Sequence, residues 1–269
     1  MQHLIQRFFP GSFKNSFILL QLIKRDFKSR YAGSTLGMVW AFLQPLSMMG
    51  ILWFVFQFGL KAQAVDQKIP FAAWFFTGMI AWNFFADVMN ANCHVLGEYS
   101  FMLKKVEFDV SSLPLVKILS ALIIHGIFLG ILICVLLISG IKPSGHWLTV
   151  FYYLGCLLYL QLGLSWLISS VNVFLRDLGQ VVSIALQLGF WVTPVIWDVG
   201  HMPAKYVLFL KLNPVMYITE GYRNAFLYER SFAEINSLWS LYFWGISTVI
   251  FILGSHIFKK MKPHFADVI

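Results

Sequence analysis

A row of polar side chains runs through one of the longest apolar stretches of this chain. Its members are Asn83, Asp87, Asn90 and His94, and Phe76 lies further along the same face. Spacings of three and four residues place the four polar groups on one side of a helix. Amides, a carboxylate and an imidazole exchange hydrogen bonds with hydroxyl groups, so this face suits the passage of a hydroxyl-rich molecule. The same row is also typical of hydrogen bonds that hold neighbouring helices together.

A second row precedes the first and carries mainly aromatic side chains. Trp40, Gln44, Phe54 and Phe58 recur at positions that share one helical face. Aromatic rings offer flat apolar surfaces on which the faces of sugar rings can pack. They are also enriched where helices cross a membrane surface. Two such rows in adjacent segments favour a lined canal, whereas each aromatic residue taken alone fits an interfacial belt.

Motifs for nucleotide, metal or redox chemistry are missing from the sequence. The chain has no G-x-x-x-x-G-K-[ST] segment and no Gly-Lys pair, so it lacks that loop for cradling ATP phosphates. Its three cysteines show neither C-x-x-C nor Cys/His spacing. The nearest approach to a cluster of acids and bases is Asp198, His201 and Glu220. We therefore expect no catalytic residue and no metal site, and the energy for any transport must come from another chain.

The elements that would position these rows follow from the composition. Hydrophobic residues make up 59% of the chain and charged residues 12%, far from the averages of soluble domains. A spanning helix needs about 20 largely apolar residues. Six runs supply them: 31–60, 71 to about 95, 118–141, 147–175, 178–197 and 238–258. The sequence predicts an all-α integral membrane protein with six transmembrane helices, and a G-x-x-x-G segment at 126–130 is a weak sign of a close helix contact.

Basic residues set the expected orientation. Short loops rich in Lys and Arg stay in the cytoplasm, and placing both termini there puts most of the 20 basic residues inside. The net charge of +8 then reflects topology and attraction to lipid headgroups rather than nucleic-acid binding. We expect a multi-pass protein of the cytoplasmic (inner) membrane.

Residues 1–30 are expected to form a cytoplasmic segment ahead of a transmembrane domain at 31–269. Phe13, Phe17 and Leu20 share an apolar face of a helix that also carries several cations. Such a helix suits the inner headgroup region, with its cations toward anionic lipids or an acidic partner. A cluster of charges that merely fixes topology is the alternative.

The region at about 198–237 departs from the pattern of spans and short loops. Gly189 and Pro194 interrupt the fifth run, and the residues that follow mix charges with short apolar pieces. These pieces are too short to span the membrane. Helices that re-enter the outer leaflet or lie on it fit best, because irregular backbone at that depth must be covered by protein or water.

Four segments, taken in order, resemble one protein family. They are IKRDFKSRYAGSTLGMVWAFLQP at 23–45, NVFLRDLGQV at 172–181, FWVTPVIW at 190–197 and NPVMYITEGYRNAF at 213–226. Together they resemble the permease subunits of ABC exporters for lipid-linked polysaccharides, the O-antigen, capsule and teichoic-acid group. The resemblance covers nearly the whole chain, and the order of the blocks is more specific than any one of them.

The resemblance implies a homodimer that docks two copies of a separate cytoplasmic ATPase. ATP and Mg²⁺ would bind to that partner, and this chain would hold no cofactor. The cargo would be an undecaprenyl-linked polysaccharide that enters from the inner leaflet beside the first and fifth spans. It would then thread a canal across the membrane, in contact with this chain and the surrounding lipids.

The resemblance also gives expected roles to four sets of residues. The canal would be lined by Trp40, Gln44, Phe54, Phe58, Phe76, Asn83, Asp87 and Asn90. The interfacial gate helix would carry Lys24, Arg25, Lys28 and Arg30. A coupling loop at about 97–113 would contact the ATPase through Glu98, Tyr99, Lys104, Lys105 and Glu107. The outer gate would contain Pro194, Pro214, Tyr217, Tyr222 and Arg223.

Two other functions fit parts of the sequence. An ABC permease for drugs or small lipids would share the fold but would have less need for aromatic rows along a whole canal. A membrane-embedded transferase acting on a lipid carrier would need clustered acids, bases or a metal near one interface.

Overall fold

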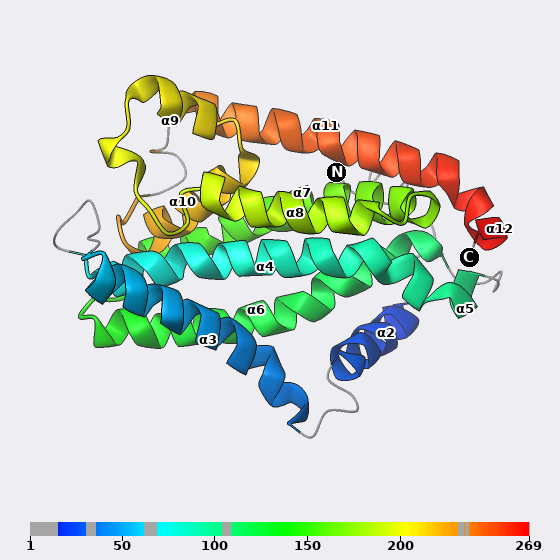
Figure 1. Ribbon diagram of the computed structural model, residues 1–269, viewed down its shortest axis with the longest axis horizontal. Helices are drawn as coiled ribbons and strands as arrows, with labels where there is room; N and C mark the ends of the chain where they lie inside the picture. The colour runs from blue at the N-terminus through cyan, green and yellow to red at the C-terminus, as the bar shows by residue number, and fades with distance from the viewer. Residues whose placement is uncertain are drawn as a thin grey trace.

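The computed structural model is a bundle of long helices that lie roughly side by side (Figure 1). It describes residues 16–30, 36–61, 69–103, 109–230, 234 and 237–268. Within these ranges every regular element is a helix, which confirms the prediction of an all-α fold.

Five helices are long and apolar enough to cross a membrane. They are α3 (Trp40–Phe54) with its π-helical continuation η2 (Val55–Gly59), α4 (Phe71–Glu98), α6 (Leu113–Ile138) after η3 (Val110–Ser112), α7 (Val150–Phe174) after η4 (Gly145–Thr149), and α11 (Ser237–Met261) with η7 (Lys262–His264). They correspond to five of the six predicted runs.

The remaining run becomes α8 (Leu178–Val192), which has 15 residues. This is fewer than the about 20 that a span requires, so the count of six spans stays a prediction. The helix ends because Thr193, which precedes Pro194, takes an extended backbone with ψ 133°. Residues before proline are disfavoured in the helical region.

The short helices gather at the two ends of the bundle (Figure 1). One end, called here the α10 end, carries η5 (Val199–His201), α9 (Ala204–Leu210) and α10 (Pro214–Phe226). The other, called the α2 end, carries α2 (Ser16–Ser29), α5 (Ser100–Leu103) and α12 (Phe265–Val268). A further short element, η1 (Gly37–Val39), leads into α3.

The central helix of the bundle is α4. Helices α6, α7, α8 and α10 all pack against it, and it buries small and large apolar side chains, among them Ala73, Phe75 and Val88. A helix that is apolar on nearly every side is expected in such a buried position. Its polar row lies on the part of the helix that these neighbours leave open, because Asn83 is half-buried and Asp87, Asn90 and His94 are exposed.

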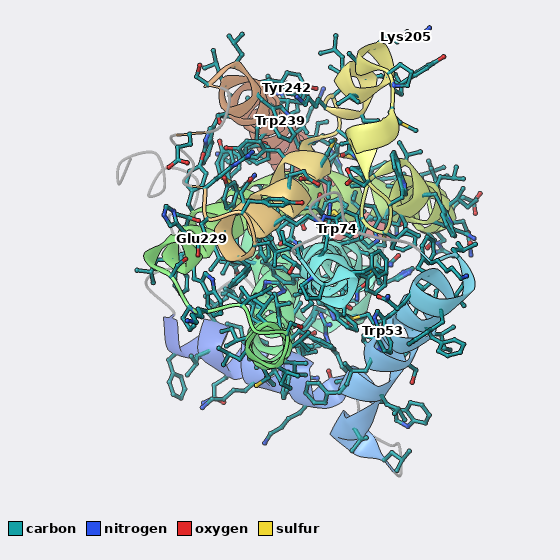
Figure 2. All side chains as sticks on the ribbon, turned by 90° about the vertical axis from the view of Figure 1, so that its left-hand side faces the viewer. Trp53, Trp74, Lys205, Glu229, Trp239 and Tyr242 are labelled. Carbon is teal, nitrogen blue, oxygen red and sulfur yellow. The ribbon has the colours of Figure 1, made fainter. Side chains whose placement is uncertain are left out.

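Figure 2 looks onto the α10 end and shows Trp74 near the centre, with Trp239 and Tyr242 toward the edge. The indole of Trp239 donates a hydrogen bond to the carbonyl oxygen of Lys211, and the Tyr242 hydroxyl donates one to that of Leu212. Both acceptors lie in the turn between α9 and α10. These bonds fasten that turn to α11.

A close backbone contact at two glycines joins α7 and α11. A Cβ atom on Gly163 would lie 2.7 Å from the Cα of Phe251, and one on Gly254 would overlap the Gly163 carbonyl oxygen. The G-x-x-x-G segment read from the sequence behaves differently, because a Cβ on Gly126 or Gly130 would meet no described atom within 4 Å. Within the described chain, that segment marks no close helix contact.

We predict opposite effects for the same substitution at two of these glycines. Alanine is favoured over glycine in a helix by about 1 kcal/mol, so Gly130→Ala should keep or raise the thermal unfolding midpoint in mild detergent. Gly254→Ala should lower it, because the new methyl group would push α7 and α11 apart. Equal midpoints for the two variants would contradict the close contact.

Candidate functional site

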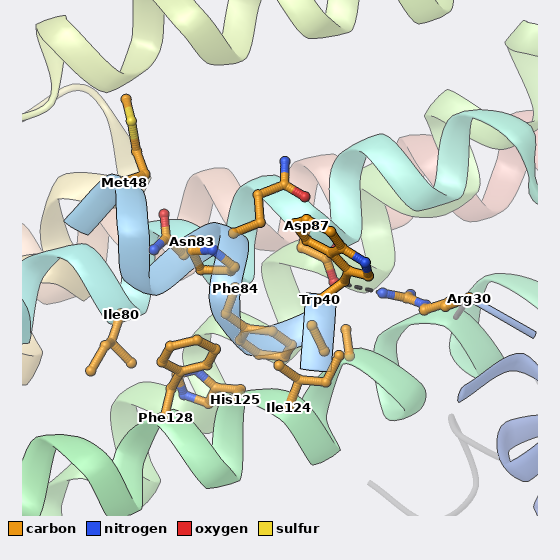
Figure 3. Close-up of a pocket in the computed structure, with 14 residues that line it drawn as sticks. Arg30, Trp40, Met48, Ile80, Asn83, Phe84, Asp87, Ile124, His125 and Phe128 are labelled. Carbon is orange, nitrogen blue, oxygen red and sulfur yellow. Dashed lines mark hydrogen bonds and ion pairs between the residues drawn. The ribbon is translucent and has the colours of Figure 1, made fainter. Parts of the chain in front are cut away.

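A pocket of about 540 Å³ lies between α3, α4 and α6. Figure 3 shows its wall residues, with Arg30 at one side. Aromatic and polar side chains face one another in it: Trp40, Gln44, Asn83, Phe84, Asp87, His125 and Phe128. Apolar residues complete the wall: Ala41, Pro45, Met48, Ile80, Ala121 and Ile124. Flat apolar surfaces beside hydrogen-bonding groups suit a ligand that has both.

Half of the predicted canal residues line this pocket, namely Trp40, Gln44, Asn83 and Asp87. The other half lie elsewhere. Phe54 and Phe58 pack on each other with ring centroids 5.4 Å apart, and their side chains are 61% and 59% exposed. Phe76 packs edge-on against Phe75. Asn90 accepts a weak hydrogen bond from Ser183 of α8 at 3.4 Å.

The α4 row is therefore shared between two neighbours. Asn90 lies roughly 10 Å further along the helix axis than Asn83, near α8 rather than α3. Asn83 and Asp87 remain beside α3 and α6. Part of the polar row therefore lines the pocket, and another part contacts a neighbouring helix.

Arg30 and Asp87 form an ion pair beside the pocket (Figure 3). Arg30 Nη1 lies 2.8 Å from Asp87 Oδ2, and Arg30 Nε lies 3.2 Å from Asp26 Oδ2. Burial alone would lower the pKa of Arg30, but the charges and hydrogen bonds of the two aspartates raise it above its usual value. The guanidinium stays charged, and Asp87 brings little uncompensated charge to the pocket.

Asp26 is the centre of a buried group of charges. Its carboxylate is 1% exposed and accepts hydrogen bonds from four side chains: Lys117, Ser120, Tyr99 and Arg30. Lys117 Nζ lies 2.6 Å from Asp26 Oδ1 and also 2.6 Å from Glu98 Oε2. We call these residues the Asp26 cluster: Asp26, Arg30, Glu98, Tyr99, Lys117 and Ser120.

The charge state of the cluster follows from its contacts. Burial by itself would raise the pKa of Asp26, but the hydrogen bonds from Lys117 and Ser120 and the nearby positive charges lower it below its usual value. Burial, with Asp26 beside it, raises the pKa of Tyr99. Asp26 is thus an ionised acceptor, and Tyr99 is a protonated donor.

The cluster joins three parts of the chain that are far apart in sequence. Asp26 belongs to α2, Glu98 and Tyr99 end α4, and Lys117 lies in α6. Through Arg30 it reaches Asp87 on the pocket wall. A continuous series of ion pairs therefore runs from the start of the predicted coupling loop to the pocket.

The predicted coupling loop is held on both sides of its central part. Glu98 and Tyr99 precede that part and belong to the Asp26 cluster, and Asp109 follows it and pairs with Lys262 at 2.8 Å. Although burial would raise the pKa of Asp109, the hydrogen bond and charge of Lys262 lower it. The predicted residues Lys104, Lys105 and Glu107 lie outside the described residues.

Three of the four cations of the predicted gate helix are exposed, whereas Arg30 belongs to the Asp26 cluster. Lys24, Arg25 and Lys28 are exposed on α2, and the Arg25 guanidinium lies 4.9 Å from the Phe101 ring centre. Phe17 and Leu20 are also exposed, at 72% and 50%. Helix α2 therefore meets the protein through its Leu22 and Asp26 side, and its apolar row faces outward.

A second buried charge lies at the α10 end. Arg223 is fully buried and donates hydrogen bonds to the carbonyl oxygens of Pro194 and Val195 and to Glu220. Its guanidinium carbon lies 3.6 Å from the centre of a Trp74 ring. A Cβ on Gly78 would come within 2.5 Å of the guanidinium, so this position needs glycine. Arg223 ties α10 to the first turns of α4 and to the segment after α8.

Three further predicted outer-gate residues, Pro214, Tyr217 and Tyr222, belong to α10 itself. Pro214 is its first residue. The Tyr217 hydroxyl donates to Ser240 Oγ at 3.0 Å, and the Tyr222 hydroxyl lies 3.0 Å from His125 Nε2 on α6. The structure thus brings the five predicted residues together at one end of the bundle.

The two carboxylates among the nearest candidates for a catalytic cluster are each engaged locally. Asp198 accepts a hydrogen bond from the Gly200 backbone, and Glu220 pairs with Arg223. Among the described residues, no group of three or more His, Cys, Asp or Glu side chains could hold a metal ion.

Sequence reasoning missed four residues of this site: Asp26, Lys117, Ser120 and His125. Two of them carried a readable signal. Asp26 is the single acidic residue of α2, and Lys117 is the single charge of α6. An isolated charge in an apolar helix such as α6 requires a partner, and the partner of Lys117 is Asp26.

Comparison with known proteins adds a family and named relatives. Residues 18–227 match the model of the family described as ABC-2 type transporter. The O-antigen export system permease proteins RfbA of Klebsiella pneumoniae and Myxococcus xanthus are 26% and 28% identical, each covering 94% of this chain and 95% of the relative. The polysialic acid transport protein KpsM of Escherichia coli is 20% identical, over 76% of this chain and 79% of KpsM.

We predict that Lys117→Met destabilises the protein strongly, because it leaves the Asp26 carboxylate buried without its lysine. Breaking a buried pair in this way costs about 3–5 kcal/mol, so the thermal midpoint in detergent should fall by several degrees. The double variant Asp26→Asn with Lys117→Met removes both charges and should recover most of the loss. Lys28→Met, at an exposed position of α2, is the control. A midpoint for Lys117→Met equal to that control would contradict the buried pair.

Proposed function

Because this chain belongs to the ABC-2 type transporter family, and is therefore a transporter permease rather than an enzyme, we propose that it exports an undecaprenyl-linked polysaccharide such as O-antigen. The observation that carries the proposal is the pocket beside α3, α4 and α6. There Trp40 and Phe128 offer flat apolar surfaces, and Gln44 and Asn83 offer hydrogen bonds. The RfbA relatives, which are named as O-antigen export permeases, support the choice of cargo.

The charge balance of the pocket favours the neutral, hydroxyl-rich sugar part of such a cargo. Its one carboxylate, Asp87, is paired with Arg30, so neither charge is available in full to an ionic ligand. Amide groups and an imidazole remain, and these donate to and accept from hydroxyl groups. A drug or small-lipid permease would gain less from such a lining, which is why that function ranks second.

We assign the α2 end to the cytoplasm. The exposed cations Lys24 and Lys28 lie there, together with the basic C-terminal turn of α11, as expected for the inner side of a membrane protein. In this orientation α8 and the residues after it form a sixth span. Helices α9 and α10 then form the re-entrant outer region, and both termini are cytoplasmic.

We further propose that the coupling loop contacts an ATPase and that the Asp26 cluster transmits its movement. The complex would be a homodimer with two ATPase copies, which bind the ATP and Mg²⁺. Lys104, Lys105 and Glu107 would meet the ATPase, and Glu98 and Tyr99 would pass the displacement to α2 and α6. Packed cores and ion-pair networks move as units rather than deform continuously, which suits this task.

The proposal predicts a stoichiometric ATPase partner and a response to glycan. Tagged protein extracted in mild detergent should co-purify with one ATPase copy per permease. Hydrolysis by this complex should rise when a polyprenyl diphosphate-linked oligosaccharide is added. A partner whose hydrolysis ignores the glycan would favour the small-lipid permease, and the lack of any partner would contradict the proposal.

The same preparation tests the coupling loop. Reversing Lys104 and Lys105 to Glu should reduce the co-purified ATPase at least severalfold, because the loop would then carry the opposite charge. Reversing Lys142, which lies in a loop, and Lys205, which lies in α9, is the matched control and should leave the yield unchanged, because both lysines are exposed and outside the coupling loop. Equal yields from both pairs would move the contact to another surface.

A further inference from the structure

We infer that His125 is a cargo-binding residue, which hydrogen-bonds a hydroxyl group of the transported glycan inside the pocket, and that Tyr222 is the residue that positions it. The inference rests on the proposed function and adds a recognition residue to it. Two observations carry it: the fixed placement of the His125 ring, and a ring nitrogen that has no partner.

Contacts on two sides fix the imidazole. His125 Nε2 lies 3.0 Å from the hydroxyl of Tyr222, which is itself fully buried on α10. The opposite contact is a stack on the Phe84 ring, with centroids 4.4 Å apart and planes 19° from parallel. Figure 3 shows His125 on the α6 wall, beside Phe84 and Phe128. The ring therefore has little freedom to turn toward another protein group.

The second ring nitrogen is buried and unsatisfied. His125 Nδ1 has no hydrogen-bond partner among the described residues, although the side chain is only 3% exposed. A buried polar atom without a partner is costly in an apolar bundle. Twelve such side-chain atoms occur among the described residues, and His125 and Arg30 are the two of their residues that line the pocket. A ligand in the pocket is therefore within reach of the His125 ring.

The hydrogen-bonding capacity of His125 and Tyr222 matches a hydroxyl group of the cargo rather than an ion. In a neutral imidazole one nitrogen donates and the other accepts. The Tyr222 hydroxyl can take either role, so Nδ1 can present a proton or a lone pair. A sugar hydroxyl also donates and accepts, and can satisfy both arrangements. A diphosphate only accepts, so it could satisfy Nδ1 in only one of the two arrangements.

The position of Tyr222 connects this contact with the α10 end. Its neighbour Arg223 binds the carbonyl oxygens of Pro194 and Val195 and packs on Trp74. A glycan hydroxyl on His125 would therefore touch a ring that is bonded directly to the outer helix. Within this scheme Tyr222 contacts no cargo and acts only by holding the imidazole.

The test compares His125→Phe with the double variant His125→Phe, Tyr222→Phe. Phenylalanine keeps the stack on Phe84 and removes both nitrogens, and the double variant also removes the tyrosine hydroxyl that would lose its partner. The readout is the probe concentration that half-maximally stimulates hydrolysis by the purified permease–ATPase complex. Two probes are used, a polyprenyl diphosphate-linked oligosaccharide and the same polyprenyl diphosphate without sugar.

We expect both variants to need about tenfold more of the glycan probe, the loss of roughly one hydrogen bond. Their response to the sugar-free probe should change far less than their response to the glycan probe, and their ATPase content should match the wild type. The double variant should be at least as thermally stable as the wild type, because the unpaired Nδ1 is gone. Tyr222→Phe alone should give a smaller loss of glycan response, since the nitrogens remain while the ring is released.

An unchanged glycan response in the double variant, with a wild type that is stimulated, would overturn the role of His125 and leave the proposed function standing. Equal losses for both probes would overturn the assignment to a sugar hydroxyl. A wild type that the glycan probe fails to stimulate would overturn the proposed function, and this inference with it.

Discussion

The arrangement at the α2 end depends on one carboxylate that has been removed from water. An ionised aspartate in a protein interior is tolerated only when charges and hydrogen-bond donors surround it. Asp26 obtains four donors, and they come from the residue that follows α2, from the end of α4 and from α6. Because this one carboxylate needs several hydrogen-bond donors, α2, the end of α4 and α6 are held together around it. This arrangement also leaves the exposed cations of α2 facing outward.

Helix α4 connects this cluster with a second buried charge. Its last residue, Glu98, belongs to the Asp26 cluster. Its first turn carries Trp74, on which Arg223 packs. The pocket lies between the two, against the middle of the same helix. Because both charges are held by several partners, each end of α4 is fixed to its neighbours. A movement of either end therefore bears on the helix that forms one wall of the pocket.

The sequence alone predicts the long helices well, since runs of about 20 apolar residues leave few alternatives. It also identifies Trp40, Gln44, Asn83 and Asp87, which share a pocket. It cannot assign an apolar face to protein or to lipid, because both are apolar. Phe17 and Leu20, expected on the apolar face of an interfacial helix, are exposed, and so are Phe54 and Phe58, which are expected in the canal and lie outside the pocket.

Long-range partners are equally hidden from a local pattern. Asp26 and Lys117 are 91 residues apart, and helical periodicity cannot pair them. The glycine contact between α7 and α11 likewise depends on two helices far apart in the chain, whereas the G-x-x-x-G segment at 126–130 is visible and makes no such contact. Helix α8 is shorter than the apolar run at 178–197 for a local reason, because Thr193, which precedes Pro194, takes an extended backbone and ends the helix inside the run.

The central claim is that the Asp26 cluster carries movement between an ATPase and the pocket. The most direct measurement is the amount of glycan exported per ATP hydrolysed in proteoliposomes. It compares the wild type with the double variant Asp26→Asn, Lys117→Met, in which both charges are removed together. The account predicts a lower ratio, with normal ATPase content and basal hydrolysis. A ratio equal to that of the wild type would show that the cluster only stabilises the fold.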